Sequence, residues 1–524
     1  MHRRCRATGR DFVVTEPELA HIEKMGRTHP SIAEPLPPPT LHPHELLNQL
    51  YSFGNLIYLY PGKSALSGAS QLSRYNPADG YRICTLDEFW SDKVDNADFG
   101  AAYDFTRPFF EQWHALSKRV YLSPLNNRNV ENSDYVNGTL NVRNCYLCFD
   151  SVESQDCLYC FVHLNGTDNL DCVGTIDSEL CYNCVDVAKC YECDHCQDCI
   201  SSSFCFGCLD CVGCNHCFGS VGARNAEYLV FNQQVSKAEY ESFVASAMLD
   251  DYGSRTAELE RCRKFHRSTG HAVQRVRNSE DCTGAYIQNS KNLFECYHAD
   301  NSRDCGYLLL GYNSHDCWRG YCWNGELSYQ SGSVGASRSY YSYSDFSGEN
   351  NLYCYLMFNR NANCFGCIGL RSKSYCILNK QYTEAEYFEL LPRIIRHMKA
   401  TKEWGEFFPP SIAPHPYNES ISPLYFEPND PERLKVRGYR FSPEQAFTSY
   451  PGALLATALP NSASGAAAKE LLKKPVLCAK TGRPFNFQAK ELQFYERRRI
   501  PLPRLHWRER LFDMLGSRAL LPAL

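Results

Sequence analysis

The sequence has neither the long apolar runs of a membrane protein nor the excess of positive charge typical of a nucleic-acid-binding protein. Its mean hydropathy is −0.43, and no apolar stretch approaches the roughly 20 residues that cross a bilayer. The formal net charge of −5 gives no electrostatic attraction for a phosphate backbone. The N-terminal residues Met1 to Cys5 are basic, but no apolar segment typical of a secretory signal follows them. We therefore expect a cytoplasmic protein that has no membrane span and binds no nucleic acid.

The sequence also lacks the motifs of familiar active sites, such as a nucleophile elbow, a phosphate-binding loop or a His-Glu-x-x-His pair. Aspartates do recur just before cysteines, and paired carboxylates can cleave glycans. Because these aspartates recur along the repeats, we interpret them as turn residues, and an enzyme is the less favoured class. Glycan binding or glycan cleavage remains an alternative. The aspartates are Asp156, Asp171, Asp198, Asp281, Asp304 and Asp316.

Cysteine, in contrast, is abundant, with 29 residues against only 6 methionines. In a reducing compartment such a number favours metal ligands or buried thiols over a disulfide framework. Sixteen of the cysteines lie between Cys145 and Cys217, and all sixteen share one three-residue frame. Within that frame, nine-residue ladders recur, the longest being Cys172, Cys181, Cys190, Cys199, Cys208 and Cys217. A fixed period of this kind indicates stacked structural repeats.

A second stretch repeats with a period of twelve residues. Asn289-Ser290, Asn301-Ser302 and Asn313-Ser314 each begin a short polar segment that aromatic and apolar residues follow. This alternation predicts short strands between tight turns. A parallel β-solenoid accommodates periods of both nine and twelve, because corners separate its short strands and inward residues of successive coils stack. A bundle of polyproline helices would need more Gly and Pro, and an α-helix would drift off one face.

The two repetitive stretches end in copies of one segment. Residues 217–243 align without a gap to residues 364–390, and eleven of the 27 positions are identical. Ser236-x-x-Glu239 and Thr383-x-x-Glu386 are both capping boxes, which predict helix starts. We expect these helices to cover the exposed ends of the solenoids. A further helix is predicted from Thr106, as its cap, to Leu116.

The two ends of the chain are also similar to each other. Cys5-Arg6-Ala7-Thr8-Gly9-Arg10 matches Cys478-Ala479-Lys480-Thr481-Gly482-Arg483, and Glu18-Leu19 matches Glu491-Leu492 at the same offset. The arginines near the C-terminus, from Arg497 to Arg510, are interpreted as a solvated face.

Several motifs resemble a large, uncharacterised family of cysteine-rich repeat proteins from ultra-small candidate-phylum bacteria, over nearly the whole chain. The motifs are Thr8-Gly9-Arg10-Asp11-Phe12, Trp90-Ser91-Asp92, Asp104 to Gln112, Asn379-Lys380-Gln381-Tyr382 and Glu403 to Pro409. The resemblance implies small α+β terminal modules that look like zinc ribbons. In this chain only Cys5, His42 and Cys84 occupy the expected ligand region, so we interpret the N-terminal zinc site as degenerate.

These patterns together predict a mainly β protein with two tandem cysteine-rich parallel β-solenoids, each followed by a capping helix, between zinc-ribbon-like terminal modules. The predicted segments are an N-terminal module (1–125), solenoid 1 (130–235), a helical connector (236–275), solenoid 2 (276–382), a helical cap with an extended segment (383–450), a linker (451–472) and a C-terminal module (473–524).

The Cys-x-x-Cys spacing of the first solenoid raises the question of metal binding. Zinc or an iron–sulfur cluster is the sharper hypothesis, and packed free thiols are the favoured one, because Val187 and Ser202 occupy positions of the same period. We predict a non-enzymatic protein that presents solenoid faces to a protein or glycan partner, with structural zinc as the alternative. The candidate metal ligands are Cys190, Cys193, Cys196, Cys199, Cys205, Cys208, Cys211, Cys214, Cys217, His195 and His216.

Overall fold

A computed structural model describes residues 1–524 except 33, 271–274, 427–429, 444–449, 464–470 and 518–524. The chain forms two compact units, and each unit joins segments that are far apart in the sequence. Unit 1 combines Met1–Leu125 with Val273–Ser442, and unit 2 combines Asn126–Ala272 with Pro443–Leu520. With 31% strand and 26% helix the structure is mixed α and β with a large, mostly parallel sheet, so the expectation of a mainly β protein understated the helices.

The first cysteine-rich region lies in unit 2 and is named here the first array (residues 127–234). Five parallel strands lie in the order β11-β10-β9-β8-β7, and β12 pairs in parallel with β13 before β14 turns back antiparallel. The strands are β7 (Asn127–Glu131), β8 (Thr139–Arg143), β9 (Phe149–Val152), β10 (Phe161–Leu164), β11 (Val173–Ile176), β12 (Asn215–Phe218), β13 (Glu227–Val230) and β14 (Gln233–Gln234).

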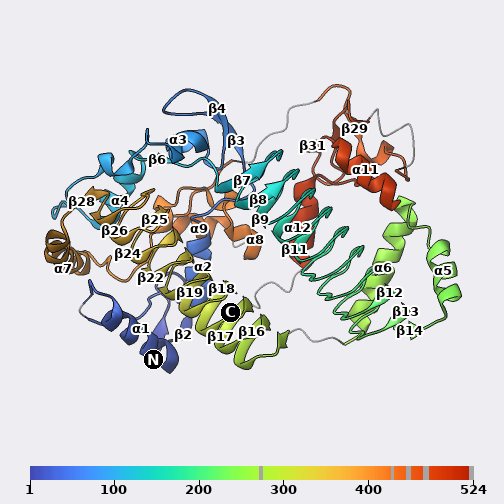
Figure 1. The fold of residues 1–524 in the computed structure, drawn as a ribbon, viewed down its shortest axis with the longest axis horizontal. Helices are drawn as coiled ribbons and strands as arrows, with labels where there is room; N and C mark the ends of the chain where they lie inside the picture. Colours follow the sequence, from blue (N-terminus) through green and yellow to red (C-terminus); the bar gives the residue numbers. More distant parts are fainter. Residues whose placement is uncertain (33, 271–274, 427–429, 444–449, 464–470, 518–524) are drawn as a thin grey trace. The chain divides into compact units, whose positions relative to one another are not determined.

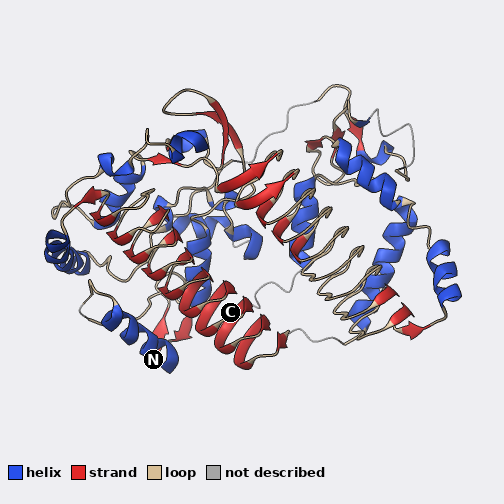
Figure 2. Ribbon diagram, viewed as in Figure 1, coloured by secondary structure: helices blue, strands red, loops and turns tan. Residues whose placement is uncertain are grey.

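Each turn of the first array contains twelve residues. Tyr146 pairs with Leu158, Leu158 with Leu170, and Leu170 with Tyr182, all in parallel. Between β11 and β12 the ribbon winds through successive turns that are drawn as loop in Figure 2, yet parallel bridges such as Val185 to Gln197 continue there. The twelve-residue step therefore persists along the array, and the nine-residue ladders of the sequence run diagonally across it.

A left-handed residue recurs at every third position of the first array, from Asn129 to Tyr228. Asn144 has φ 57° and Asp156 has φ 55°. Asn and Asp tolerate this conformation better than other non-glycine residues, because their short side chains bond locally. The aspartates that precede cysteines are therefore corner residues, as expected. Their side chains also bond to the next turn, since Asn144 donates to Asp156 at 3.0 Å.

Helices follow the last strands of the first array. Both hydrogen bonds of the predicted capping box at Ser236 are present, and they start α5 (Lys237–Ser246). Tyr240 of α5 is buried, and α6 (Tyr252–Ser268) follows. The C-terminal part of unit 2 adds β29 (Leu454–Leu455), η5 (Ala456–Ala458), β30 (Val476–Leu477), β31 (Pro484–Phe485), α11 (Ala489–Arg498) and α12 (Trp507–Ser517).

Unit 1 contains the second array (residues 276–381), a 14-stranded sheet that is parallel except at its closing hairpin. Its turns vary in length, since Arg303 pairs with His315 twelve residues later and His315 pairs with Glu326 eleven residues later. The strands are β15 (Val276–Arg277), β16 (Glu280–Gln288), β17 (Lys291–Asp300), β18 (Arg303–Tyr312), β19 (His315–Trp323), β20 (Glu326–Tyr329), β21 (Gly332–Val334), β22 (Ser337–Tyr340), β23 (Tyr343–Phe346), β24 (Glu349–Leu352), β25 (Tyr355–Met357), β26 (Ala362–Phe365), β27 (Ser374–Ile377) and β28 (Lys380–Gln381).

The rest of unit 1 packs around this array (Figure 1). The predicted capping box at Thr383 starts α7. The remaining elements are β1 (His2–Arg4), β2 (Asp11–Val13), α1 (Glu16–Thr28), α2 (Pro43–Tyr51), β3 (Tyr60–Lys63), β4 (Ser70–Ser73), η1 (Pro77–Asp79), β5 (Arg82–Ile83), α3 (Leu86–Trp90), η2 (Asn96–Phe99), α4 (Phe109–Ser117), β6 (Tyr121–Leu122), α7 (Glu384–Ala400), η3 (Pro410–Ile412), η4 (Tyr417–Glu419), α8 (Ser422–Tyr425) and α9 (Pro431–Val436).

The helix predicted from Thr106 is present as α4, but Thr106 does not cap it. The N-cap position is Pro108, which has no side chain able to accept a hydrogen bond. Instead, the carboxylate of Glu403 accepts the N–H groups of Phe109 and Phe110 at 2.8 and 2.7 Å. A distant residue therefore satisfies the exposed helix N–H groups, and local sequence gave no sign of it. Among the described residues, no helix is both long and apolar enough to cross a membrane.

Candidate metal site in the thiol-lined interior

The sixteen cysteines of the first array form four columns in its interior, and all of them are buried. Members of one column follow each other at multiples of twelve residues, so they lie one above the other on successive turns. The first column holds Cys145, Cys157, Cys181, Cys193, Cys205 and Cys217, the second Cys148, Cys160, Cys172, Cys184, Cys196 and Cys208, the third Cys199 and Cys211, and the fourth Cys190 and Cys214.

Backbone carbonyls surround the sulfurs of these columns. The Cys208 thiol, for example, lies 3.6 Å from the carbonyl oxygen of Phe206 and 3.3 Å from that of Cys217, nine residues later. This pattern repeats from Cys145 to Cys217. The nine-residue spacing in the sequence therefore corresponds to the distance along the chain between a thiol and the second carbonyl oxygen that it contacts. Burial raises the pKa of Cys148, Cys160 and Cys184 well above the usual value, so these thiols are protonated and can donate. At Cys172 and Cys196 burial is outweighed by hydrogen bonds from neighbouring thiols, which lower the pKa of both.

Other small side chains fill the same columns without disturbing them. Val187 lies one turn before Cys199, and Ser202 lies between Cys190 and Cys214. The Ser202 hydroxyl donates to the carbonyl of Ile200 at 3.0 Å and accepts the N–H of Cys214 at 3.2 Å. The columns thus require a small buried side chain, and cysteine is one of several that fit.

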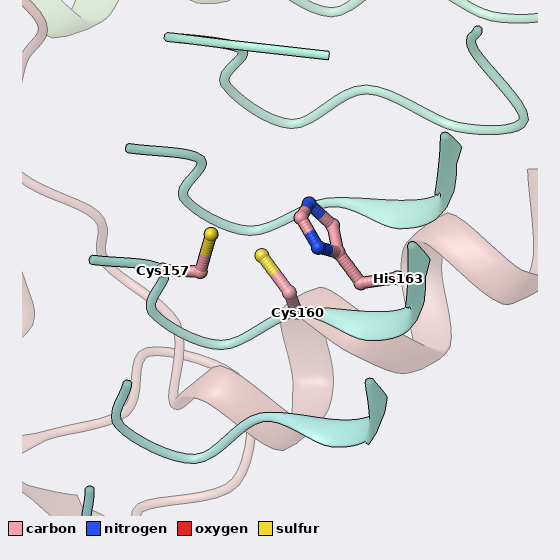
Figure 3. Close-up of side chains that lie close together, drawn as sticks. All are labelled: Cys157, Cys160 and His163. Carbon is pink, nitrogen blue, oxygen red and sulfur yellow. The ribbon is translucent and has the colours of Figure 1, made fainter. Parts of the chain in front are cut away.

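Within the described residues, one turn brings together three groups that could hold a metal ion. Cys157, Cys160 and His163 are all buried, and their ligand atoms lie within 4.8 Å of one another (Figure 3). They occupy the first, second and third columns of a single turn. This donor set of two sulfurs and one nitrogen is typical of zinc, which usually takes four ligands.

The imidazole of His163 already has hydrogen-bond partners at both nitrogens. Nε2 lies 3.0 Å from the Asn169 amide nitrogen, and Nδ1 lies 2.9 Å from the Ser154 hydroxyl. Because the amide can only donate, Nε2 accepts and Nδ1 carries the proton. Burial lowers the pKa of His163, so the ring is neutral.

The fourth column of this turn is occupied by Gly166. A Cβ atom at this position would lie 1.6 Å from Cε1 of His163. The imidazole therefore fills the space that a fourth inward side chain would take, and it also excludes a fourth ligand from that turn.

The two histidines predicted as ligands do not face the thiols. His195 lies at a corner, and its Nδ1 is 2.6 Å from a carboxylate oxygen of Asp194. The ring of His216 stacks on Phe204 with centroids 4.8 Å apart, and the tilted ring of Tyr228 lies 5.4 Å away. The sequence does contain a signal for the histidine that lies beside the thiols, because of these three histidines only His163 shares the three-residue frame of the cysteines.

The three residues predicted to form a degenerate zinc site, Cys5, His42 and Cys84, are only partly brought together. The N–H of His42 contributes a hydrogen bond to the Cys5 thiol; burial raises the pKa of this thiol, but that bond and others from Thr8 and Ala7 lower it overall. The His42 ring accepts the N–H of His44 through Nδ1 at 3.2 Å. Cys84 lies elsewhere in unit 1, donates to the carbonyl of Leu122 at 3.7 Å, and has a pKa raised by burial to about 12.

The C-terminal module reproduces this arrangement in unit 2. The Thr481 hydroxyl and the N–H of His506 lower the pKa of Cys478 against the effect of burial. The His506 Nδ1 accepts the N–H of Arg508 at 3.1 Å, as His42 does with His44. In both copies a threonine hydroxyl hydrogen-bonds to the cysteine three residues before it.

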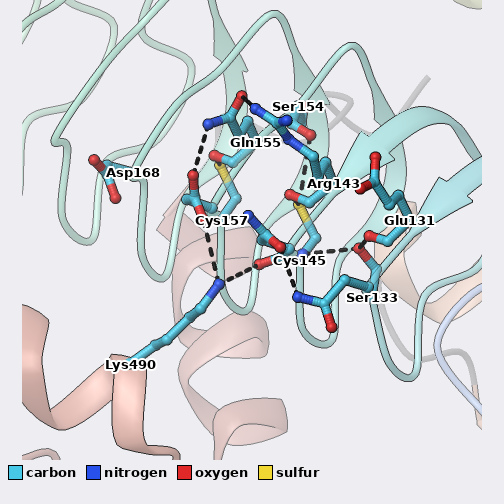
Figure 4. A network of polar contacts seen from close by, with 12 residues as sticks. Glu131, Ser133, Arg143, Cys145, Ser154, Gln155, Cys157, Asp168 and Lys490 are labelled. Atoms are coloured by element: carbon cyan, nitrogen blue, oxygen red, sulfur yellow. Dashed lines mark hydrogen bonds and ion pairs between the residues drawn. The ribbon is translucent and has the colours of Figure 1, made fainter.

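The outer corners of the first array carry polar side chains (Figure 4). Arg143 donates to Gln155 at 2.7 Å, and Gln155 donates to Asp156 at 2.8 Å. Lys490 of α11 lies 3.3 Å from the same aspartate. These contacts join the C-terminal part of unit 2 to the array.

No family model matches the chain, and the search of curated proteins gives no significant match.

Proposed function

We propose that the protein is a non-enzymatic cytoplasmic scaffold, built on two closed β-solenoids, that presents their outer faces to a protein partner. Support for the closed form comes from the in-register step of twelve residues and the left-handed corner at every third residue. The proposal also assigns the chain to the candidate-phylum family that its motifs resemble.

One observation carries the scaffold interpretation: thiols along the whole first array lie within hydrogen-bonding distance of backbone carbonyls. Metal ligation needs thiolates, whereas burial raises the pKa of Cys157 and Cys160 and favours their protonated form. Protonated thiols pack as small, weakly polar groups that hold successive turns together.

The exposed aromatic residues favour a protein partner over a glycan. Phe204 is 38% exposed, but its ring stacks on His216 with centroids 4.8 Å apart and planes 22° from parallel. Sugars stack on open ring faces, and the stack on His216 covers one face of the Phe204 ring. Aromatic residues are enriched at protein interfaces.

Metal analysis together with a thiol count tests the proposal. Protein purified without oxygen should contain no stoichiometric zinc or iron. Of the 29 cysteines only Cys282 is not buried, so native protein should alkylate at one site and unfolded protein at all 29. Several tightly bound metal ions per chain would refute the packed-thiol interpretation.

Zinc at Cys157, Cys160 and His163 is the second candidate, because their ligand atoms already converge. Its fit is incomplete, since His163 Nε2 would have to lose its bond from Asn169, and the fourth ligand would have to come from a neighbouring turn, where Cys148 and Cys172 lie in the second column. If zinc binds there, His163→Ala should lose one equivalent of zinc, and the control His216→Ala should lose none.

A further inference from the structure

Unit 2 contains a cavity of about 430 Å³ beside the first array. Its walls come from the outer side of the first array, from α6 and from residues 501–514. Tyr182 and His195 line it on the array side, Tyr252 and Arg255 on the helix side, and Arg504 and Arg510 on the third side. Its volume is within the range of small-molecule sites, roughly 300–1,000 Å³.

Arg504 is the unusual member of this lining. It is only 8% exposed, and it hydrogen-bonds to the carbonyl oxygens of Ala456 and Pro460 and to the side-chain oxygen of Asn461. Its guanidinium lies 4.7 Å from the ring centroid of Tyr252. In the part of the chain that the structure describes, no carboxylate lies within ion-pair distance of it.

The other buried arginines of the cavity differ from Arg504 in this respect. Arg255 is paired with Asp194, and Arg510 lies 2.9 Å from Asp171. A buried cation without an anion is costly, and proteins normally supply a partner. Burial lowers the pKa of Arg504, the direction expected for a cation that lacks an anion. Asp513 also lines the cavity, but its carboxylate lies 3.3 Å from Lys480. Among the described residues, Arg504 is therefore a guanidinium of this wall that has no carboxylate at ion-pair distance.

We propose that this cavity binds a small organic anion whose carboxylate or phosphate group pairs with Arg504. Guanidinium groups match the two oxygens of either anion. The aromatic ring of Tyr252 and the His195 imidazole, which Asp194 holds in place, offer surfaces for the body of such a ligand. Cys196 and Cys208 of the second column also line the cavity, but the proposed contact with Arg504 does not depend on metal.

Binding of three oxyanions tests the proposal: inorganic phosphate, citrate and adenosine monophosphate. At least one should raise the melting temperature of the full-length protein in a saturable manner, and hydrogen exchange should slow in residues 501–510 and in α6. The variant Arg504→Gln should weaken the affinity at least tenfold. Arg497→Gln is the matched control, because Arg497 lies in the same unit with its side chain 55% exposed.

If Arg504→Gln fails to fold, Arg504→Lys replaces it, since lysine keeps the charge and loses the two-pronged geometry. Exchange protection is also measured on the unaltered protein, so the test does not depend on a variant. The proposal is overturned if none of the three anions gives a saturable shift, if protection appears outside the cavity walls, or if Arg504→Gln binds as tightly as Arg497→Gln.

Discussion

The two arrays use the same kind of turn but fill it differently. The first array keeps twelve residues per turn, and sixteen cysteines occupy its interior between Cys145 and Cys217. The second array contains nine cysteines between residues 276 and 382, and its turns have eleven, twelve or thirteen residues. Buried serines take many of its interior positions, namely Ser328, Ser331, Ser333, Ser339 and Ser342.

This difference shows what the interior positions demand. Ser342 donates to the carbonyl of Tyr340 at 3.1 Å and accepts the N–H of Cys354 at 3.0 Å. In the first array the thiols lie against carbonyls in the same way. A small side chain that can hydrogen-bond to the backbone is therefore sufficient, and sulfur chemistry is not required at most positions.

The closing segments of the arrays are nearly identical in structure. Asn232 and Asn379 are both left-handed with φ 64°. Each side chain accepts an N–H and donates to a C=O of the residue eleven positions earlier, Val221 and Ile368 respectively. The duplication seen in the sequence therefore preserves hydrogen bonds as well as residue types.

The largest expected difference between the units concerns the duplicated glutamates of the terminal modules. Glu18 and its partner Arg319 are both fully buried in unit 1, and Tyr329 adds a contact at 3.5 Å. Glu18→Ala leaves Arg319 buried and unpaired, so unit 1 should lose about 3–5 kcal/mol of stability. Urea unfolding followed by tryptophan fluorescence measures this loss, because five of the six tryptophans belong to unit 1.

Glu491→Ala is the matched variant in unit 2. Arg510 keeps Asp171 at 2.9 Å, so the expected loss is smaller, about 1–3 kcal/mol for the unpaired hydroxyls of Tyr159 and Tyr495. Hydrogen exchange in unit 2 measures it. If Glu491→Ala lowers the unfolding free energy as much as Glu18→Ala, the carboxylate of Asp171 does not compensate Arg510 for the loss of Glu491.

The second array also buries a carboxylate, which should make its stability depend on pH. Burial raises the pKa of Asp345 from 3.8 to about 6, although Asn351 donates to it at 3.1 Å. Between pH 4 and pH 6 the folded state holds a proton that the unfolded state has lost, so stability falls as the pH rises, by about 3 kcal/mol in total.

Asp345→Asn should remove this contribution. The variant and the parent protein should have similar urea midpoints at pH 4, and the variant should be more stable at pH 8. Equal midpoints at both pH values would show that Asp345 titrates normally in the folded state.

Local sequence revealed the repeat but not its turn length or its tertiary contacts. The three-residue frame of the cysteines and the capping boxes at Ser236 and Thr383 both describe the structure correctly. Nine and twelve are both multiples of three, so the three-residue frame alone did not distinguish a turn of nine residues from a turn of twelve. The position of His163 in the three-residue frame could have identified it from the sequence. In contrast, the surroundings of Arg504 and the contact of Glu403 with the N-terminus of α4 involve residues far apart in the chain.

The two capping boxes offer a smaller and more symmetrical comparison. Ser236→Ala and Thr383→Ala each remove the acceptor for a helix N–H and should cost about 1 kcal/mol each, within a range of about 0.5–2 kcal/mol. The larger effect is expected at Thr383, because α7 buries Leu391, Ile394 and Met398 whereas α5 buries only Tyr240. Hydrogen exchange in α5 and α7 measures the two stability losses. A larger loss of protection in α5 than in α7 would contradict the expectation that Thr383→Ala has the larger effect.

The smallest expected effect tests the idea that column positions require only size and shape. Cys199→Val places in the third column the residue that Val187 already supplies one turn earlier. Because the volumes are similar, the change in unfolding free energy should stay below about 1.5 kcal/mol, and metal content should not change. Cys199→Asp is the contrasting variant, since it buries a charge without a partner and should destabilise unit 2 strongly. If Cys199→Val lowers the unfolding free energy as much as Cys199→Asp, the sulfur of Cys199 contributes more than its volume. The thiol columns of the first array would then have a chemical requirement that the buried serine positions of the second array lack.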